Sequence, residues 1–273
     1  MHLDVVELRD FYASPVGQMV ARHLAPVVRS LVKSDARTRV LGFGFPTPYL
    51  GTIDIAERVL AFMPAGQGVI DWPQGSDSAG SATALVEEDS LPLPDSSIDL
   101  VILIHALEMS DRPNALMSEL RRVLTAGGQL IVVVPNRQGP WATTDLSPFG
   151  FGRPYSRGQL RSLFAEVGFE AETWTTGLHM APPAWQPLLR AARVLDKVGR
   201  LVWPAFAGVI VVSAVKRTVQ VIGVRARSRL SPALRPALGP PAGAIGRALS
   251  AVRAGISPDR QARSTGEAAQ FRS

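Results

Sequence analysis

The sequence predicts an α/β fold built on a seven-stranded, mostly parallel sheet with helices on both faces. Short apolar runs alternate along the chain with stretches of helical periodicity, and this alternation is typical of a parallel sheet. The run 100–104 (LVILI) has no polar alternation, as expected for a strand that is buried on both faces. A turn with Gly42 and Gly44 follows the first apolar run, where such a sheet presents backbone N–H groups to a polar ligand.

One or two helices are expected before the first strand. Between residues 5 and 32, apolar residues recur mostly at steps of three and four, with interruptions at Pro15 and Pro26. After the second strand, a stretch rich in Gly, Pro and Ser takes the place of the usual helix. The expected elements of this half are helices at 5–32, a strand at 40–43, a short helix at 49–58, a strand at 59–63 and a loop at 64–82.

The second half of the domain continues the same alternation. The Gly127-Gly128 pair is expected to stop a helix, and Ser156 and Gly168 are expected to begin and end another. A second long loop spans residues 137–156. The expected strands are 84–87, 99–104, 130–134, 169–173 and 208–214, and the expected helices are 114–124, 156–167 and 182–200.

Basic residues are concentrated at the carboxyl end of the chain. Residues 216–273 hold 11 of the 29 Lys and Arg but only two of the 23 acidic residues, a net charge of +9 against −3 in the rest. The sequence therefore predicts an N-terminal helical segment (1–36), an α/β domain (37–217) and a basic, disordered tail (218–273). Weak contact of the tail with anionic membrane or nucleic acid is expected, and plain solvated disorder is the alternative.

Composition also excludes several kinds of chemistry. Cysteine is absent, which excludes disulfides, thiolate metal ligands and a cysteine nucleophile. The four histidines are scattered without metal-ligand spacing, so no metal is expected. The N-terminus does not resemble a signal peptide, and the longest apolar run, 201–215, is shorter than the roughly 20 residues that span a bilayer. We therefore expect a cytoplasmic protein.

Three stretches in the middle of the chain occur together in one known family. They are LPLPDSSIDLV at 91–101, HALE at 105–108 and ELRRVLTAGGQL at 119–130. This combination closely resembles the central region of class I S-adenosylmethionine-dependent methyltransferases of the small-molecule type, over residues 40–214. The stretches 148–156 and 203–209 look similar to one alphaproteobacterial branch of such proteins. The resemblance implies a Rossmann-like fold, an S-adenosylmethionine pocket and a small-molecule acceptor.

The resemblance also implies cofactor-binding residues at the ends of three strands. The turn departs from the family, because Pro46 and Pro48 replace glycines and residues 62–64 supply no acid for the ribose hydroxyls. His105 is the catalytic candidate, as a general base near neutral pH, and a satisfied histidine at a strand end is the alternative. The implied cofactor-binding residues are Gly42, Gly44 and Phe45 in the turn, Glu87, Glu88 or Asp89 for the adenine amino group, and His105.

The two long loops supply the candidate acceptor residues. Loop aromatics beside glycines favour a lid over an acceptor, and a packed surface loop is the alternative. Asp95 and Asp99 are expected to fix a turn and the start of a strand and not to take part in chemistry. The candidates are Trp72 in the first loop and Asn136, Arg137, Trp141, Arg153 and Tyr155 in the second.

Two functions from different classes remain open. The first is a methyltransferase acting on an unidentified small molecule, a reaction that needs alignment of acceptor and methyl more than it needs a base. The second is a methyltransferase-like binding or scaffold protein, with an apolar or protein partner, that has lost the cofactor. The prolines of the turn and the missing ribose acid favour the second, whereas the three central stretches favour the first.

Overall fold

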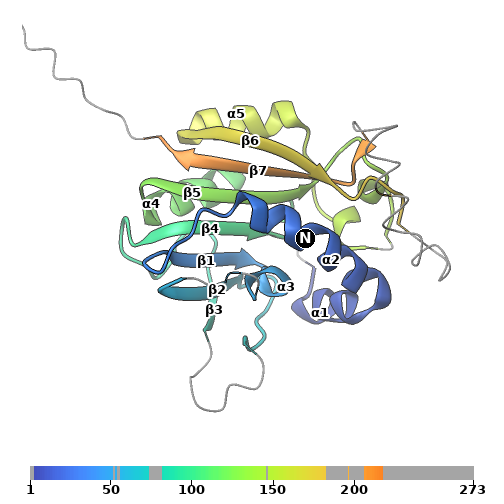
Figure 1. Ribbon diagram of the computed structural model, residues 1–273, viewed down its shortest axis with the longest axis horizontal. Coiled ribbons are helices and arrows are strands. Elements are labelled where there is room, and N and C mark those ends of the chain that lie inside the picture. The colour runs from blue at the N-terminus through green and yellow to red at the C-terminus, as the bar shows by residue number, and fades with distance from the viewer. Residues whose placement is uncertain are drawn as a thin grey trace, which may run out of the picture. The chain divides into compact units, whose positions relative to one another are not determined.

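The computed structural model describes residues 3–51, 53, 56–73, 82–145, 147–182, 196 and 206–217 (Figure 1). The basic tail and, except for Asp196, residues 183–205 lie outside the described residues, so the predictions for those segments stay predictions. No helix in the described ranges is long and apolar enough to cross a bilayer.

Seven strands form one sheet in the order β3-β2-β1-β4-β5-β7-β6. The pairs from β3 to β5 are parallel, and β7 runs antiparallel to both β5 and β6. The predicted seven-stranded, mostly parallel sheet is therefore confirmed. The strands are β1 (Arg39–Gly44), β2 (Arg58–Pro64), β3 (Thr83–Val86), β4 (Ile98–Ile104), β5 (Leu124–Pro135), β6 (Phe169–Gly177) and β7 (Val209–Lys216).

Helices cover both faces of the sheet, as predicted. On β4, Leu100 and Ile102 pack under the N-terminal helices, whereas Val101 and Leu103 pack under α4 and α5, because successive side chains of a strand point to opposite faces. This double burial explains why the sequence of β4 is apolar without alternation. The helices are α1 (Val5–Ala13), α2 (Pro15–Leu31), α3 (Thr47–Leu50), α4 (Pro113–Val123) and α5 (Arg157–Val167), with 3₁₀ turns η1 (Pro140–Thr143) and η2 (Pro148–Gly150).

The predicted helix boundaries follow capping side chains. Ser14 accepts a hydrogen bond from the N–H of Gly17 and so separates α1 from α2, whereas α2 continues through Pro26. Ser156 and Gln159 form the capping box that begins α5, and Gly168, with φ +88°, ends it. The apolar residues of α1 and α2 share one core with the sheet, so the segment 1–36 packs directly on the α/β domain.

Two predicted elements were wrong. The helix expected at 49–58 ends at Leu50, and β2 begins at Arg58, next to the amino end of β1. The chain must return along the whole of β1, about 20 Å, and the ten residues of the expected helix would cover only about 15 Å. Gly127 and Gly128 do not stop α4 either, since the helix ends at Val123 and both glycines lie within β5.

Candidate active site

The turn after β1 lies in close contact with the carboxyl end of β4. The N–H of Phe45 donates to the carbonyl of Ile104 over 2.8 Å. Gly44 has φ +92°, and a Cβ atom there would stand 2.1 Å from the same carbonyl oxygen, so only glycine fits. Gly42 lies under the ring of Pro46. Contacts within the protein thus require both glycines.

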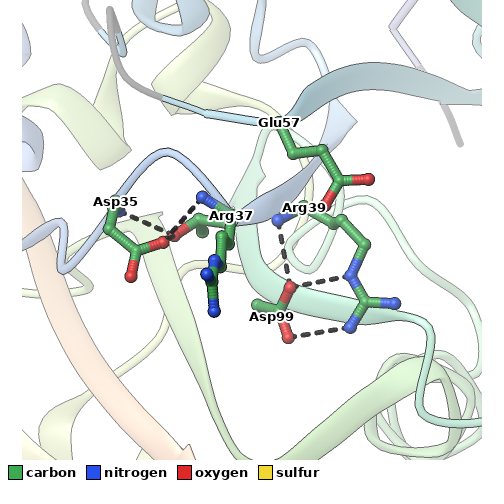
Figure 2. A pocket seen from close by; sticks show the side chains of 6 residues that line it. Asp35, Arg37, Arg39, Glu57 and Asp99 are labelled. Atoms are coloured by element: carbon green, nitrogen blue, oxygen red, sulfur yellow. Dashed lines mark hydrogen bonds and ion pairs between the residues drawn. The ribbon is translucent and has the colours of Figure 1, made fainter.

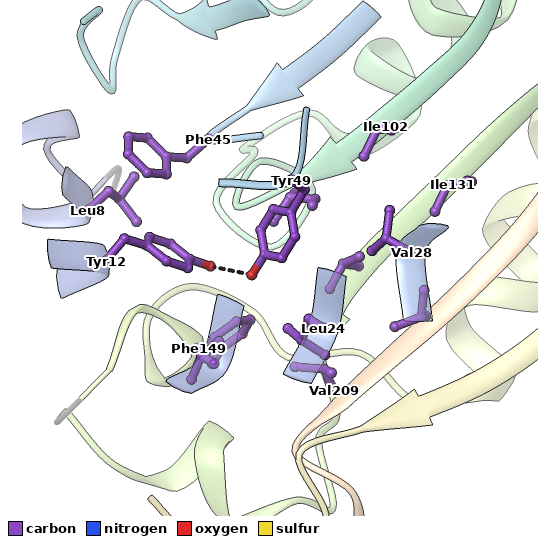
Figure 3. Packing of buried hydrophobic residues seen from close by; sticks show 14 of the residues in the cluster. Leu8, Tyr12, Leu24, Val28, Phe45, Tyr49, Ile102, Ile131, Phe149 and Val209 are labelled. Carbon is purple, nitrogen blue, oxygen red and sulfur yellow. Dashed lines mark hydrogen bonds between the residues drawn. The ribbon is translucent and has the colours of Figure 1, made fainter. Parts of the chain in front are cut away.

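Aromatic side chains fill the space beyond this turn (Figure 3). The ring of Tyr12, from α1, stacks on Phe45 with 5.6 Å between ring centres. The Tyr12 hydroxyl lies 2.9 Å from the hydroxyl of Tyr49, which belongs to α3. Burial raises the pKa of both tyrosines, and the neighbouring Tyr49 adds to the effect on Tyr12, so both phenols keep their protons at neutral pH.

His105 lies directly after β4 in a left-handed backbone conformation, with φ +53°. Its Nε2 atom is 2.9 Å from the Tyr12 hydroxyl, and its Nδ1 atom is 3.3 Å from a carboxylate oxygen of Glu108. Its side chain is 0% exposed and that of Glu108 is 1% exposed, so neither reaches solvent directly. Both carboxylate oxygens of Glu108 lack a hydrogen-bond partner among the described residues. Sequence reasoning identified His105 but assigned no role to Glu108 or Tyr12.

An open groove of about 410 Å³ lies beside this cluster, between α1, the turn after β1 and the loop after β2. We call it the α1 groove. Its polar lining includes the Asp71 carboxylate, the Arg9 guanidinium and the Thr47 hydroxyl, and its apolar lining includes aromatic rings. The lining residues are Arg9, Tyr12, Ala13, Phe45, Thr47, Pro48, Ile70, Asp71 and Trp72.

The groove offers the groups that an adenosyl sulfonium compound requires. A carboxylate can accept hydrogen bonds from ribose hydroxyls, aromatic faces can pack against adenine or the sulfonium, and a guanidinium can pair with the methionine carboxylate. Asp71 is exposed and follows the end of β2 by seven residues. Residues 62–64, where the family places such an acid, contain none, and nothing in the sequence indicated that Asp71 lines a groove. Phe45, predicted for the cofactor, and Trp72, predicted for the acceptor, both line this groove.

Two of the three predicted adenine-binding acids have side-chain partners within the described part of the protein. Glu87 is exposed, Glu88 accepts a hydrogen bond from the Ser110 hydroxyl over 2.9 Å, and Asp89 forms an ion pair with Arg112 over 2.6 Å. The latter two contacts tie the turn after β3 to the loop after β4. None of the three acids lines the α1 groove. Their role toward adenine stays a prediction.

The second loop contributes Trp141 to the buried core. Trp141 is 0% exposed and donates from its indole N–H to the carbonyl of Met180, and its place over an acceptor stays a prediction that this burial does not favour. Asn136 is buried and donates to the carbonyl of Ala207, while its side-chain oxygen accepts from the N–H of Gln138. These contacts fit the cap of a turn.

The other loop candidates lie closer to Glu108. Arg153 donates its backbone N–H to the carbonyl of Glu108 over 2.7 Å, and its side chain is exposed. Tyr155 is half-buried, and burial with the nearby Glu108 raises its pKa. Arg137 is exposed. Contact of these residues with an acceptor stays a prediction.

A second cavity, of about 500 Å³, opens at the opposite edge of the sheet (Figure 2). There Arg39 of β1 holds Asp99 of β4 with two side-chain hydrogen bonds of 2.8 and 3.0 Å. The Arg39 guanidinium lowers the pKa of Asp99. Asp99 thus fixes the start of its strand, as predicted, and the Arg39 guanidinium satisfies its carboxylate. Across the described part of the chain, no group of three or more potential metal ligands occurs.

The strand order with an antiparallel β7, together with a groove at the carboxyl ends of β1 and β2, defines a class I methyltransferase fold. Residues 42–132 match a family model described as a methyltransferase domain. By sequence, residues 42–132 are thus similar to a methyltransferase domain, and the strand order is that of the class I S-adenosylmethionine-dependent methyltransferase fold.

Curated relatives match the same part of the chain. A probable S-adenosylmethionine-dependent methyltransferase of Mycolicibacterium smegmatis is 38% identical over 84 residues, which are 30% of this chain and 32% of the relative. The malonyl-[acyl-carrier protein] O-methyltransferase of Methylococcus capsulatus is 32% identical over 113 residues, 40% of this chain and 38% of the relative. The chain thus covers about a third of the length of these relatives.

Solved structures share the fold over more of the chain. A possible histamine N-methyltransferase from Thermotoga maritima matches with a TM-score of 0.52 and 18% identity, over 78% of this chain and 96% of that one. The [4+2]-cyclase SpnF matches with a TM-score of 0.53 and 21% identity, over 74% of this chain and 82% of that one. At these identities the likeness concerns the fold, and a fold hosts more than one reaction.

Proposed function

We propose that the protein is an S-adenosylmethionine-dependent methyltransferase that acts on a small molecule and holds its cofactor in the α1 groove. The observation that carries this proposal is the set of groups that line the groove, at the edge of a parallel sheet where ligands bind. The match of residues 42–132 to a methyltransferase domain supports it. Bound adenosylmethionine would supply an electrophilic methyl group.

In this proposal each groove residue contacts a different part of the cofactor. Asp71 would accept hydrogen bonds from the ribose hydroxyls, and Arg9 would pair with the methionine carboxylate. Trp72 and the Tyr12–Phe45 stack would pack against the apolar parts of the ligand. Arg9 already contacts Asp10 at the surface over 2.9 Å, an exposed pair that costs little to exchange for a ligand.

Calorimetric titration with adenosylhomocysteine tests the proposal. We expect binding by the wild type, and about 10- to 100-fold weaker binding by Asp71→Asn, because a hydrogen bond to a charged group contributes about 1.5–3 kcal/mol. Asp95→Asn, on the other side of the domain, is the matched control and should bind as the wild type does. Absence of binding up to about millimolar ligand would contradict the proposal.

The second candidate is a binding protein without a cofactor. Phe45 and Tyr49 are 2% and 0% exposed, so aromatic side chains occupy the end of β1 that glycines leave open in the family. This candidate predicts that the purified protein carries an apolar or protein partner and transfers no methyl group. Transfer of a labelled methyl from adenosylmethionine to any acceptor would exclude it.

The remaining expectations depend on parts of the chain outside the described residues. A cytoplasmic location and weak contact of the tail with anionic surfaces stay predictions. Deletion of residues 218–273 should leave the thermal unfolding of the domain unchanged and should remove any salt-sensitive binding to anionic vesicles.

A further inference from the structure

His105 lies behind the α1 groove and bonds to residues from two of its walls. Its Nε2 atom is 2.9 Å from the hydroxyl of Tyr12, which belongs to α1. Its backbone carbonyl accepts a hydrogen bond of 3.3 Å from the side-chain amide of Gln67, which lies in the loop after β2. Tyr12 lines the groove, whereas His105 and Gln67 do not. His105 therefore connects two walls of the groove from inside the protein.

Gln67 also bonds directly to the beginning of α1. Its backbone carbonyl accepts a hydrogen bond of 2.7 Å from the N–H of Val5, the first residue of the helix. Gln67 thus holds α1 at one end, and His105 holds it through Tyr12 near the other end. The bond between Gln67 and His105 joins these two points. A helix that is held at both ends does not pivot about either of them, so these three contacts fix the orientation of α1 relative to the loop after β2.

The orientation of α1 sets the spacing of two charged groups in the groove. Arg9 and Tyr12 lie three residues apart on α1, so their side chains share one face of the helix, and both line the groove. Asp71, in the loop after β2, lines the same groove. A pivot of α1 would therefore change the distance between the Arg9 guanidinium and the Asp71 carboxylate. A ligand that contacts both groups binds more tightly than its parts only when this distance matches its length.

The surroundings of His105 suit a fixed support. Its side chain is 0% exposed, and its ring packs on Phe149 with 4.7 Å between ring centres. Its backbone has φ +53°, a conformation that glycine adopts without strain and that costs free energy in a histidine. The contacts of the side chain offset this cost. Burial and packing thus hold the Nε2 atom in one place beside Tyr12.

We propose that His105 is a positioning residue of the α1 groove. Through Tyr12 and Gln67 it holds α1 at the spacing from the loop after β2 at which one adenosyl compound reaches both Arg9 and Asp71. The inference rests on the proposed function, because that function places the cofactor in this groove. The role requires no proton transfer by His105, in contrast to the predicted role as a general base.

Calorimetric titration of the full-length protein with two compounds tests the inference. Adenosine carries only the base and the ribose, whereas adenosylhomocysteine also carries the amino-acid part. His105→Asn keeps a residue that tolerates the left-handed backbone but is too short to reach Tyr12, and Tyr12→Phe removes the hydroxyl. We expect both variants to bind adenosylhomocysteine about 10-fold or more weakly and adenosine less than about 2-fold more weakly, because only the longer compound depends on the spacing.

Two further variants separate positioning from a general effect on the fold. His105→Gln places an amide nitrogen near the position of Nε2 and should restore the wild-type ratio of the two affinities. His23→Gln is the matched control. It removes an imidazole of α2 that lies 2.8 Å from the carbonyl of Met19 and does not line the groove, so the ratio should stay that of the wild type.

Hydrogen exchange of the α1 amides provides a readout that needs no ligand. Loss of the bond between His105 and Tyr12 should make these amides exchange about 5-fold faster in His105→Asn and in Tyr12→Phe, because a single hydrogen bond changes a local opening equilibrium by about this factor. The amides of α4 and α5 should exchange as in the wild type. His105→Gln should leave the exchange of α1 unchanged.

Several results would overturn the positioning role. One is an affinity ratio that either His105→Asn or Tyr12→Phe leaves unchanged, and another is a ratio that stays low in His105→Gln. Equal weakening of adenosine and adenosylhomocysteine would also overturn it, because His105 would then support the loop after β2 alone. A wild type that binds neither compound fails the proposed function instead. In that case, or if adenosine alone does not bind, the exchange of α1 decides: faster exchange in His105→Asn supports the role, and unchanged exchange overturns it.

Discussion

Gly42 and Pro46 lie so close together that a Cβ atom on residue 42 would stand 2.5 Å from Cγ of the proline ring. Pro46 therefore has a structural role. Its ring packs on Gly42 of β1 at the point where the chain turns into α3. The ring occupies the volume above Gly42, whereas the α1 groove is lined by the neighbouring Phe45, Thr47 and Pro48 and not by Pro46.

Gly42→Ala is expected to destabilise the domain. The added Cβ would meet Pro46 and, at 2.9 Å, the Leu50 side chain, and such overpacking costs about 1–3 kcal/mol of unfolding free energy. Urea denaturation measures the loss. Gly51→Ala is the control, because nothing lies within 4 Å of its added Cβ and the change should stay below about 0.5 kcal/mol. Equal stability of the two variants would show that the turn is looser than described.

The pair Arg39–Asp99 predicts a pH-dependent contribution to stability. The guanidinium lowers the pKa of Asp99 in the folded state, so the pair stabilises the fold above the unfolded pKa of aspartate, about 4. This stabilisation is lost as the pH falls through the lower folded value. Asp99 is 31% exposed, so Asp99→Asn should cost only about 1 kcal/mol at pH 7.

Urea denaturation of wild type and Asp99→Asn at several pH values between neutral and about 2.5 measures this contribution. The difference between the two proteins should be full at pH 7 and should shrink below about pH 4. Asp95→Asn serves as control, because Asp95 is 76% exposed in its pair with Arg122. A difference that grows on acidification would contradict the assignment.

The fold was predictable because its signals are local. The apolar residues of β4 and the capping side chains at Ser156 and Gly168 identify elements from neighbours in sequence alone. The helix expected after β1 failed because its length is fixed by the return path to β2, a distance in space that periodicity does not contain. The prediction that Gly127 stops α4 also failed, because β5 begins directly after α4 and the glycine lies in the strand.

The candidate site was predictable only at the strand ends. His105 could be found because it directly follows β4, and Trp72 because the loop replaces a helix. Tyr12 and Asp71 could not, since α1 and residues 70–72 meet the sheet edge only through tertiary packing. The position of Glu108 three residues after His105 was visible in the sequence. That the two side chains are buried side by side was not.

Arg122 is expected to hold the turn before β4 on α4. Its guanidinium donates to the carbonyls of Leu91 and Leu93 over 3.0 and 2.9 Å and pairs with Glu119 over 2.6 Å. Lysine keeps the charge but not the fork of donors, so Arg122→Lys should cost about 1–3 kcal/mol of unfolding free energy. The exposed Arg157→Lys is the matched control and should be neutral in the same urea titration. A neutral Arg122→Lys would show that the fork is not needed.

Trp141, which lies in the core, and Trp72, which lines the α1 groove, are expected to respond differently to substitution. Trp141→Phe removes the donor to the buried carbonyl of Met180 and leaves a space in the core, so we expect a loss of about 2–4 kcal/mol in unfolding free energy. Adenosylhomocysteine binding should be unchanged, because Trp141 does not line the α1 groove. Trp72→Phe should behave in the opposite way, with weaker binding and little change in stability. Calorimetry and urea denaturation of both variants separate the two roles. A binding defect found only in Trp141→Phe would contradict this assignment and would support a role of Trp141 in a lid over the ligand.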